Sequence, residues 1–551
     1  MNKVKIIFLT VIILITSLAY GCSDNESDGS DFLFSCSLLG NPQNLDPQMA
    51  TDTSSFTVIK NMYSGLLKLD SNGVLTNDIA KSYTISDDGL KYTFELRDNC
   101  YWYSKDFEDD EDNEGDEKIK VTAKDFVFAF QRIFNPQMQS PYSKDFICLK
   151  NAAAIINGAM DYTCIGVTAV SDFQLVIELD NPNANFLTLL TTPPAIPCHE
   201  EFFNSTKGRY GLDKDSVISN GSFYLTEWFY DQYGPENILI MRRNSFNSEV
   251  NRVYPSSLKF IIEKDYESQL KSFKDKKTDY ILTDVYPDKF DKKDYTINEY
   301  ECSTLGIIFN LNDEVYSNEN IRRAFALSIN REDLQSELKT NEVSVAGAIV
   351  PPNAVLLNKS YRELVAEEYL SEYNEDKAIK SLEDGMAELN ISSLNTVKIL
   401  VAENMMNSDY MHFFTQKWQQ IFGVYIGFET VTQSEYEQKL RNGEYQMAIS
   451  EMSGSYNSVF SILSNFSSEK NTFGYSSVET DNLLSSVESI SSLSECVDIF
   501  RDIEKQIISD SSFIPIFYKK KYLIYRKTNA DIVYYPFSGH IDFQYAKYFE
   551  D

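Results

Sequence analysis

The sequence contains little histidine and tryptophan, and it lacks the short motifs of several enzyme classes. Its 551 residues include three histidines, and none of His199, His412 and His540 has a second histidine at metal-ligand spacing. A G-x-S-x-G elbow, a P-loop and a dinucleotide-binding glycine fingerprint are missing as well. No pair among the 82 acidic residues stands out as a catalytic pair. We therefore expect a protein that is not an enzyme and carries neither a cofactor nor a metal.

Positive charge is also scarce. The chain has 50 Lys and Arg residues against 82 Asp and Glu, which gives a formal net charge of −32. A basic footprint for DNA or RNA is missing, so we expect no nucleic-acid partner. Acidity is densest in residues 106–117. Within them Asp110, Asp112 and Glu114, followed by Gly115, resemble the start of a calcium loop, but the twelfth place of that loop is Val121 instead of the bidentate Glu. We interpret this segment as a solvated surface loop.

Regularly spaced cysteines are missing too. The eight cysteines are scattered, and no C-x-x-C pair occurs. If Cys22 carries a lipid, seven remain, so at least one stays a free thiol in any intramolecular pairing. Cys148 and Cys164 are the closest pair, and they either form a bridge or remain free thiols, which are common in protein cores.

The one long hydrophobic run lies at the N-terminus. Two lysines precede the apolar residues 6–19, which are too few for a membrane span of roughly 20 residues and are typical of a signal peptide. The run ends at Cys22 in a pattern that resembles the bacterial lipobox, although Leu18 lies one place early. We predict removal of residues 1–21 and lipidation of Cys22, with plain secretory cleavage as the alternative. Residues 22–30 then form a flexible tether.

Local patterns predict several elements. Residues 31–39 have the composition of a strand, and residues 53–63 have helical spacing. Residues 86–89 form a strong hairpin-turn signal. Thr122 followed by Asp125 predicts a helix start with a capping box. Further helices are expected over 374–389, 409–422 and 436–440, and a strand is expected over 424–432.

Residues 441–457 combine a turn, a strand and a loop of small polar residues. Gly443 suits the positive φ that the turn needs, and residues 445–449 alternate like a strand. The small residues that follow would let a ligand approach the backbone closely, and loops on a rigid scaffold often carry function. An ordinary surface loop is the alternative interpretation.

Short motifs occur in a fixed order along most of the chain. Each is weak alone, and together they span roughly residues 35 to 545. They include NLDP at 44–47, SDDGLKYTFELR at 86–97, VTAKDFV at 121–127, IRRAFALSINR at 321–331 and FIPIFY at 513–518. In this order they resemble the oligopeptide-type, family 5, solute-binding proteins of ABC importers. We interpret the arginines and turns of these motifs as structural.

The resemblance implies an α/β fold of the periplasmic-binding-protein-like type II class, with two lobes, a hinge and an extra subdomain. Lobe I would combine residues 31–60, 191–300 and 525–551. The extra subdomain would span residues 61–190, and lobe II would span residues 301–524. Two crossing strands would join the lobes, and ligand binding would shift an open form to a closed one.

The resemblance also implies a function. The protein would capture oligopeptides outside the cytoplasm and deliver them to the permease and ATPase subunits of an ABC importer. Its lipid anchor would hold it at the outer face of the bacterial cytoplasmic membrane. Binding of a blocked or modified peptide, binding of an oligosaccharide, and a role as receptor of a peptide signal also fit the sequence.

The resemblance places the ligand between two main-chain edges, near residues 51–53 and 453–455, where strand-like pairing gives affinity that does not depend on ligand sequence. Tyr142, Tyr436 and Met452 match positions that line side-chain pockets, although core packing is equally compatible with them. The candidate ligand-binding residues are Thr51, Asp52, Thr53, Tyr142, Tyr436, Glu451, Met452, Ser453, Gly454, Ser455, Tyr456 and Asn457.

Ser455 is the main departure from the family pattern, which has an Asp at this position to hold the peptide amine. A buried ammonium needs an anion, because an unpaired buried charge is costly. Glu451 or Asp52 could supply that anion. Cys302 occupies a position from which some relatives bridge to the loop, but the matching loop residue here is Ser453.

Overall fold

A computed structural model describes residues 32–549. Its gaps are residues 72, 104–117, 235, 286–289, 339, 358, 366–369, 371, 406–410 and 491. The predicted signal peptide, Cys22, the tether and the acidic segment 106–117 lie outside the described residues. None of the helices in the described part is long and apolar enough to cross a membrane.

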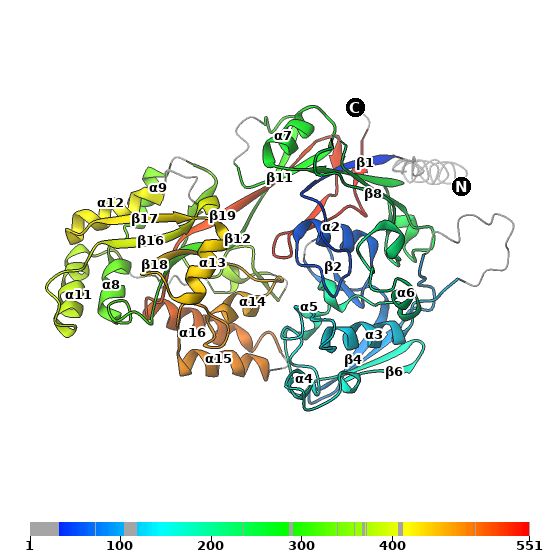
Figure 1. The fold of residues 1–551 in the computed structure, drawn as a ribbon, viewed down its shortest axis with the longest axis horizontal. Helices are drawn as coiled ribbons and strands as arrows, with labels where there is room; N and C mark the ends of the chain where they lie inside the picture. Colours follow the sequence, from blue (N-terminus) through cyan, green and yellow to red (C-terminus); the bar gives the residue numbers. More distant parts are fainter. Residues whose placement is uncertain are drawn as a thin grey trace, which may run out of the picture.

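The chain forms two lobes that are joined at one side (Figure 1). The first lobe, mainly blue to green, contains a four-stranded sheet in the order β1-β10-β9-β8. Its strands are β1 (Leu33–Leu39), β10 (Ser257–Glu263), β9 (Ile238–Arg243) and β8 (Phe223–Phe229). Every second residue of β1 from Phe34 to Leu38 is buried, which is the period of a strand with one face on a core. Helix α2 (Thr53–Met62) packs beside β22 (His540–Asp542), so the C-terminal segment returns to this lobe.

A subdomain extends the first lobe. Its sheet has the order β4-β5-β7-β6, and α3 (Ala123–Phe134) packs against it. The strands are β4 (Ala80–Ile85), β5 (Lys91–Leu96), β7 (Gln174–Glu178) and β6 (Val167–Ser171). The predicted capping box is confirmed, because the Asp125 carboxylate accepts the Thr122 N–H at 2.7 Å. Phe34 and Phe94 belong to one hydrophobic cluster, so the subdomain and the first sheet share a core.

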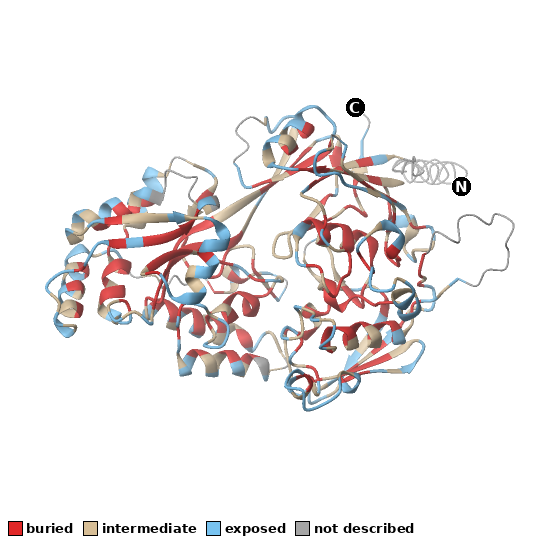
Figure 2. Cartoon of the chain, in the orientation of Figure 1, coloured by how far each residue is buried: buried red, intermediate tan, exposed pale blue. Residues whose placement is uncertain are grey.

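The second lobe is built on a seven-stranded sheet in the order β11-β19-β12-β18-β16-β17, with β13 paired to β19, and the β11 end of this sheet lies beside β1 in the first lobe. The strands are β11 (Tyr280–Thr283), β19 (Phe513–Arg526), β12 (Tyr295–Phe309), β18 (Met447–Met452), β16 (Val397–Ala402), β17 (Ile426–Val431) and β13 (Val343–Val345). Helices cover this lobe, among them α8 (Glu319–Leu327), α11 (Glu375–Glu388), α12 (Met411–Phe422), α13 (Gln433–Asn442), α14 (Val459–Leu463) and α16 (Cys496–Ser509). Figure 2 shows that buried residues line the strands and the helix faces turned toward them.

Two long strands connect the lobes. β12 and β19 pair along almost their whole length, from Tyr295 opposite Arg526 to Ile308 opposite Phe513. One end of this ribbon pairs with β11, and the other end pairs with β18. The ladder shifts register at two places, between Glu301 and Ser303 and between Leu305 and Gly306. Such bulges bend strands locally, so they mark where the connection can flex.

Each lobe contains a buried ion pair. In the first lobe, the two terminal guanidinium nitrogens of Arg132 donate to the Asp46 carboxylate, and the side chain of Arg132 is 3% exposed. In the second lobe, Glu504 in α16 is fully buried and accepts two bonds from Arg362, at 2.6 and 2.7 Å. Glu504 also accepts the N–H groups of Ile349 and Val350 at 2.9 and 2.8 Å. Paired and hydrogen-bonded in this way, these charges fix the chain segments they join.

Several local predictions are confirmed and one open question is resolved. Gly443 ends α13 with φ of 68°, as the turn requires. The expected helices over 374–389 and 409–422 correspond to α11 and α12, whereas α13 is longer than the predicted 436–440. Cys148 and Cys164 are not joined by a disulfide bond, so the bridge that the sequence left open is not formed.

Candidate functional site

A cavity of about 450 Å³ lies between the two lobes, and we call it the main cavity. Segments that are distant in sequence meet around it, among them the start of α2, the subdomain loop near Tyr142, the loop after β18, and residues 536–539. It brings together seven of the predicted ligand-binding residues, namely Thr51, Thr53, Tyr142, Glu451, Ser453, Ser455 and Tyr456. A volume of this size is in the range of ligand sites in proteins.

The loop after β18 is held in shape from behind. The backbone N–H of Ser455 donates to the Ser461 hydroxyl at 2.9 Å, and Asn465 donates to the Ser453 carbonyl at 2.8 Å. A Cβ atom at Gly454 would lie 2.9 Å from the Tyr456 carbonyl oxygen, so the backbone can pass this close to that oxygen only with glycine at position 454. The second lobe therefore presents this loop to the cavity as a preformed edge.

Tyr436, Met452 and Gly454 do not line the main cavity. Tyr436 is 4% exposed and donates its hydroxyl to the Ile449 carbonyl at 2.7 Å, while Met452 is 5% exposed. Both side chains belong to a hydrophobic cluster of the second lobe. The structure corrects the expectation that they line a side-chain pocket, because their positions put them under the loop. Their spacing alone could not distinguish a pocket from the core.

The two carboxylates expected to replace the missing Asp at position 455 are already engaged. Asp52 caps α2 by accepting the Ser55 N–H at 2.8 Å. Glu451 lies 3.7 Å from Lys519, which also pairs with Asp284 at 3.2 Å. Asp52 is committed to capping α2, whereas the 3.7 Å pair with Lys519 leaves acceptor sites on Glu451, which lines the main cavity.

Other residues of the cavity wall were not found by sequence reasoning. Asp145, Lys521 and Phe537 line the main cavity together with Cys302. No local sequence motif places these residues together, because they come from the subdomain, the crossing strands and the C-terminal segment. Cys302 is a free thiol that lines the cavity together with Ser453, and burial raises its pKa to about 11.

A side cavity of about 550 Å³ adjoins the main cavity on the first lobe. It is lined by Asp52 and Asp284, and it shares Thr53, Lys521 and Gly539 with the main cavity. The space between the lobes is therefore continuous on both sides of Thr53. An elongated ligand has more room here than the main cavity alone provides.

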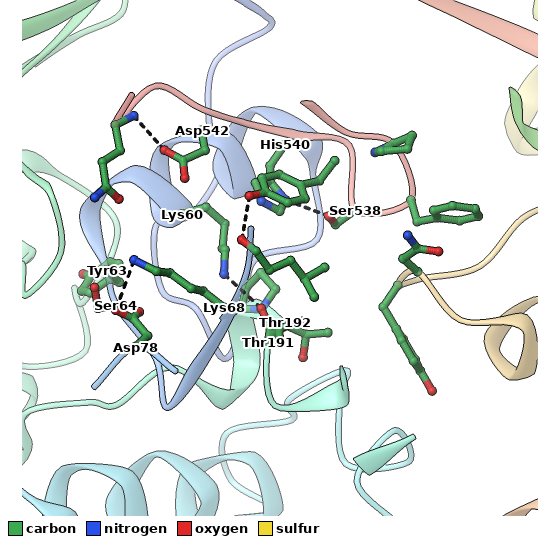
Figure 3. Close-up of a pocket in the computed structure, with 18 of the residues that line it drawn as sticks. Lys60, Tyr63, Ser64, Lys68, Asp78, Thr191, Thr192, Ser538, His540 and Asp542 are labelled. Atoms are coloured by element: carbon green, nitrogen blue, oxygen red, sulfur yellow. Dashed lines mark hydrogen bonds and ion pairs between the residues drawn. The ribbon is translucent and has the colours of Figure 1, made fainter. Parts of the chain in front are cut away.

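A smaller pocket of about 70 Å³ opens off the opposite side of the main cavity, and we call it the end pocket (Figure 3). It shares six lining residues with the main cavity, which are Thr192, Pro193, Tyr456, Pro536, Phe537 and Ser538. Its inner wall carries the charged side chains of Lys60, Lys68, Asp78 and Asp542, together with His540. Asn457, the last of the predicted residues, lines this pocket instead of the main cavity.

The lobes touch beside the end pocket. Tyr456 of the second lobe packs against the first-lobe cluster, and Phe537 packs against a second-lobe cluster. The Ser458 hydroxyl donates to the Asn185 side-chain oxygen at 2.8 Å, and both residues are 4% exposed. These contacts cross from one lobe to the other, so any motion that separates the lobes must break them.

The described residues contain no group of three or more His, Cys, Asp or Glu side chains placed to hold a metal ion. What the site offers instead is main-chain edges, hydroxyl groups and a few charged side chains around a continuous space. This chemistry suits the reversible binding of an extended polar molecule.

Comparison with known proteins gives a consistent result. The family described as "Bacterial extracellular solute-binding proteins, family 5 Middle" matches residues 74–474. The dipeptide-binding protein DppE of Bacillus subtilis is 23% identical over 510 residues, which cover 92% of this chain and 90% of DppE.

Solved structures share the fold. The substrate-binding domain of an oligopeptide ABC transporter from Bacillus anthracis has a TM-score of 0.72 and 23% identity, and 95% of this chain and 99% of that chain are covered. The pheromone receptor PrgZ has a TM-score of 0.73 and 22% identity, with 95% and 100% covered. The expectation of a two-lobed α/β fold of the periplasmic-binding-protein-like type II class is confirmed.

Proposed function

Because this chain belongs to family 5 of the bacterial extracellular solute-binding proteins, we propose that it captures oligopeptides and delivers them to an ABC importer. The observation that carries the proposal is the main cavity, whose walls come from both lobes and include Thr51 of the first lobe and Ser453 of the second. An extended peptide binds between two such walls through hydrogen bonds of its own backbone, whatever its side chains are. The similarity to the dipeptide-binding protein DppE supports the same substrate class.

Binding and delivery would follow from lobe closure. We keep the division into lobe I (31–60, 191–300 and 525–551), the subdomain (61–190) and lobe II (301–524) as part of the proposal. A ligand that touches both walls stabilises the closed form. Shifting a protein from almost entirely open to almost entirely closed takes about 5.5 kcal/mol of differential affinity. The permease and ATPase subunits would then act on the closed, loaded form.

Anchoring at Cys22 and removal of residues 1–21 belong to the same proposal. A diacylated cysteine holds a globular domain stably at a membrane surface, whereas one acyl chain binds only marginally. The protein would then work as a lipid-anchored binder at the outer face of the cytoplasmic membrane, without catalysing a reaction. A role as receptor of a peptide signal is the second candidate, and the similarity to the pheromone receptor PrgZ favours it over oligosaccharide binding.

Mass spectrometry of molecules that co-purify with the gently isolated protein tests the proposal. We expect a heterogeneous set of short peptides, because main-chain recognition tolerates many sequences. A Ser455→Trp variant should lose them, since its side chain would fill the main cavity, whereas Ser82→Trp, at an exposed position of β4, should retain them. A sugar in place of peptides would overturn the peptide assignment, and one dominant peptide sequence would favour the receptor role.

A further inference from the structure

The end pocket contains an ammonium group that lacks an ion-pair partner among the described residues. Lys60, in the last turn of α2, donates to the Thr191 carbonyl at 3.0 Å. In the part of the chain that the structure describes, no carboxylate lies within ion-pair distance of its Nζ, although the side chain is half-buried. An ammonium can donate three hydrogen bonds, and only one is used here. Two donors therefore remain for something that enters the pocket.

The facing carboxylate, Asp542, also has an unused oxygen. One of its oxygens accepts the Gln544 N–H at 2.8 Å, and the other has no hydrogen bond to any described residue. The neighbouring charged side chains, Lys68 and Asp78, already have partners within the protein. Lys68 pairs with Glu249 at 2.7 Å and lies 3.9 Å from Asp78, whose carboxylate also accepts the Gly65 N–H at 3.1 Å.

The charges of the residues that line the pocket disfavour a charged ligand group. Two lysines and two aspartates line it, so their formal charges cancel. Burial lowers the pKa of Lys60 and raises the pKa of Asp542, which shows that the pocket solvates charge poorly. A ligand ammonium would be repelled by Lys60, and a ligand carboxylate would be repelled by Asp542. An uncharged group that both accepts and donates hydrogen bonds meets neither penalty.

The volume of the pocket also limits the size of the ligand group that it can hold. A water molecule needs roughly 10–15 Å³ of such space, so the cavity of about 70 Å³ holds a group of a few heavy atoms. A sugar ring would be too large. Because the pocket opens into the main cavity between Tyr456 and Phe537, it is positioned to receive the end of a ligand that lies in the main cavity.

We propose that the end pocket binds the uncharged amide at a blocked end of a peptide, with the amide oxygen on Lys60 and the amide N–H on Asp542. An amide supplies one acceptor and one donor without charge, as the two unsatisfied groups require. Its source is either an acylated amino end or a carboxamide at the other end. The inference rests on the proposed function, which places the rest of the peptide in the main cavity.

A retention experiment with the full-length protein tests this inference. The protein is incubated with an equimolar mixture of three random tetrapeptide libraries that carry free ends, acetylated amino ends or amidated carboxyl ends. Retained peptides are then counted by mass spectrometry. We expect one of the two blocked forms to be enriched at least tenfold over the free form, and its identity assigns the source of the amide.

Variants separate this inference from the proposed function. Lys60→Met and Asp542→Asn should each abolish the enrichment while peptides are still retained, and Lys81→Met, which changes an exposed lysine on β4, should preserve it. A melting curve for each variant confirms that it is folded. Equal or preferential retention of the free form by the unmodified protein, or enrichment that survives both variants, would overturn the inference. No retention of any library by the unmodified protein would instead overturn the proposed function.

Discussion

Glu504 in the second lobe is fully buried and Lys60 in the first lobe is half-buried, and the surroundings of these two charged groups differ completely. The oxygens of Glu504 accept four hydrogen bonds, two from Arg362 and two from backbone N–H groups. Lys60 makes one hydrogen bond, to a backbone carbonyl, and the carboxylates of the described residues all lie beyond ion-pair distance from it.

This difference identifies Glu504 as a charge that stabilises the fold and Lys60 as a charge that lacks an ion-pair partner among the described residues. Moving a charge out of water costs several kcal/mol, and a protein recovers that cost only when the charge is paired and hydrogen-bonded. Glu504 meets this condition within the folded chain. Lys60 does not, so its remaining hydrogen bonds depend on what enters the end pocket. Three experiments test this contrast on the ligand-free protein, and each measures the free energy of unfolding.

The largest effect is expected for Glu504→Gln. This variant leaves Arg362 buried without its counter-charge, and breaking a buried pair in this way typically costs about 3–5 kcal/mol. The measurement is the shift in urea midpoint at constant slope. A loss below about 1 kcal/mol would show that Glu504 is not a structural charge. The double variant Glu504→Leu with Arg362→Met removes both charges and should lose less than the single variant.

An intermediate effect is expected from acid acting on His540. Burial lowers its pKa well below the ordinary value of 6.5, because the ring is 6% exposed and faces Lys60. Near pH 6.5 the imidazole therefore becomes protonated in the unfolded chain but stays neutral in the folded protein. Because the unfolded chain binds the extra proton, the free energy of unfolding falls as the pH drops below that value. Each pH unit below 6.5 should cost about 1.4 kcal/mol from this group.

The control for this prediction is His540→Gln, whose stability should fall less steeply between pH 6.5 and 5.5. Asp78 and Asp542 act in the opposite direction, because burial raises their pKa values, and they are unchanged in the variant. Parallel stability profiles for the two proteins would show that His540 accepts a proton in the folded state. It would then resemble a solvated group more than a buried one.

The smallest effect is expected for Lys60→Met. The variant loses one hydrogen bond, worth roughly 0.5–1.5 kcal/mol, but it also removes the cost of burying an unpaired ammonium. The two terms oppose each other, so stability should change by less than about 1 kcal/mol. Arg362→Met is the matched comparison and should lose several times more. If Lys60→Met destabilised the protein as much as Arg362→Met, the contrast between the two charges would be wrong.

Local sequence signals predicted the elements that surround the site. The capping pair Thr122 and Asp125, the positive φ at Gly443 and the helix over 53–63 each depend on residues within a few positions. Such interactions form wherever the sequence places them, so they can be found without the fold. The same holds for the strand that delivers the loop at Ser453, since its alternation is visible in five residues.

The walls of the cavities could not be predicted in this way. Lys60, Thr191 and His540 meet in the end pocket although each is more than 100 positions from the next in the chain. Tyr436 and Met452 carried the right residue types for a ligand pocket, and tertiary packing put them in the core instead. Whether a side chain is satisfied or left with a free donor depends on such long-range placement.

The two strands that connect the lobes have a mechanical consequence. A single connecting segment would let the lobes bend and twist independently, but β12 and β19 are hydrogen-bonded to each other as they cross. Twisting one strand against the other would break bonds of that ladder, so the pairing restricts how the lobes move relative to each other. A distance between the lobes that is measured across the main cavity therefore reports how far the protein has opened.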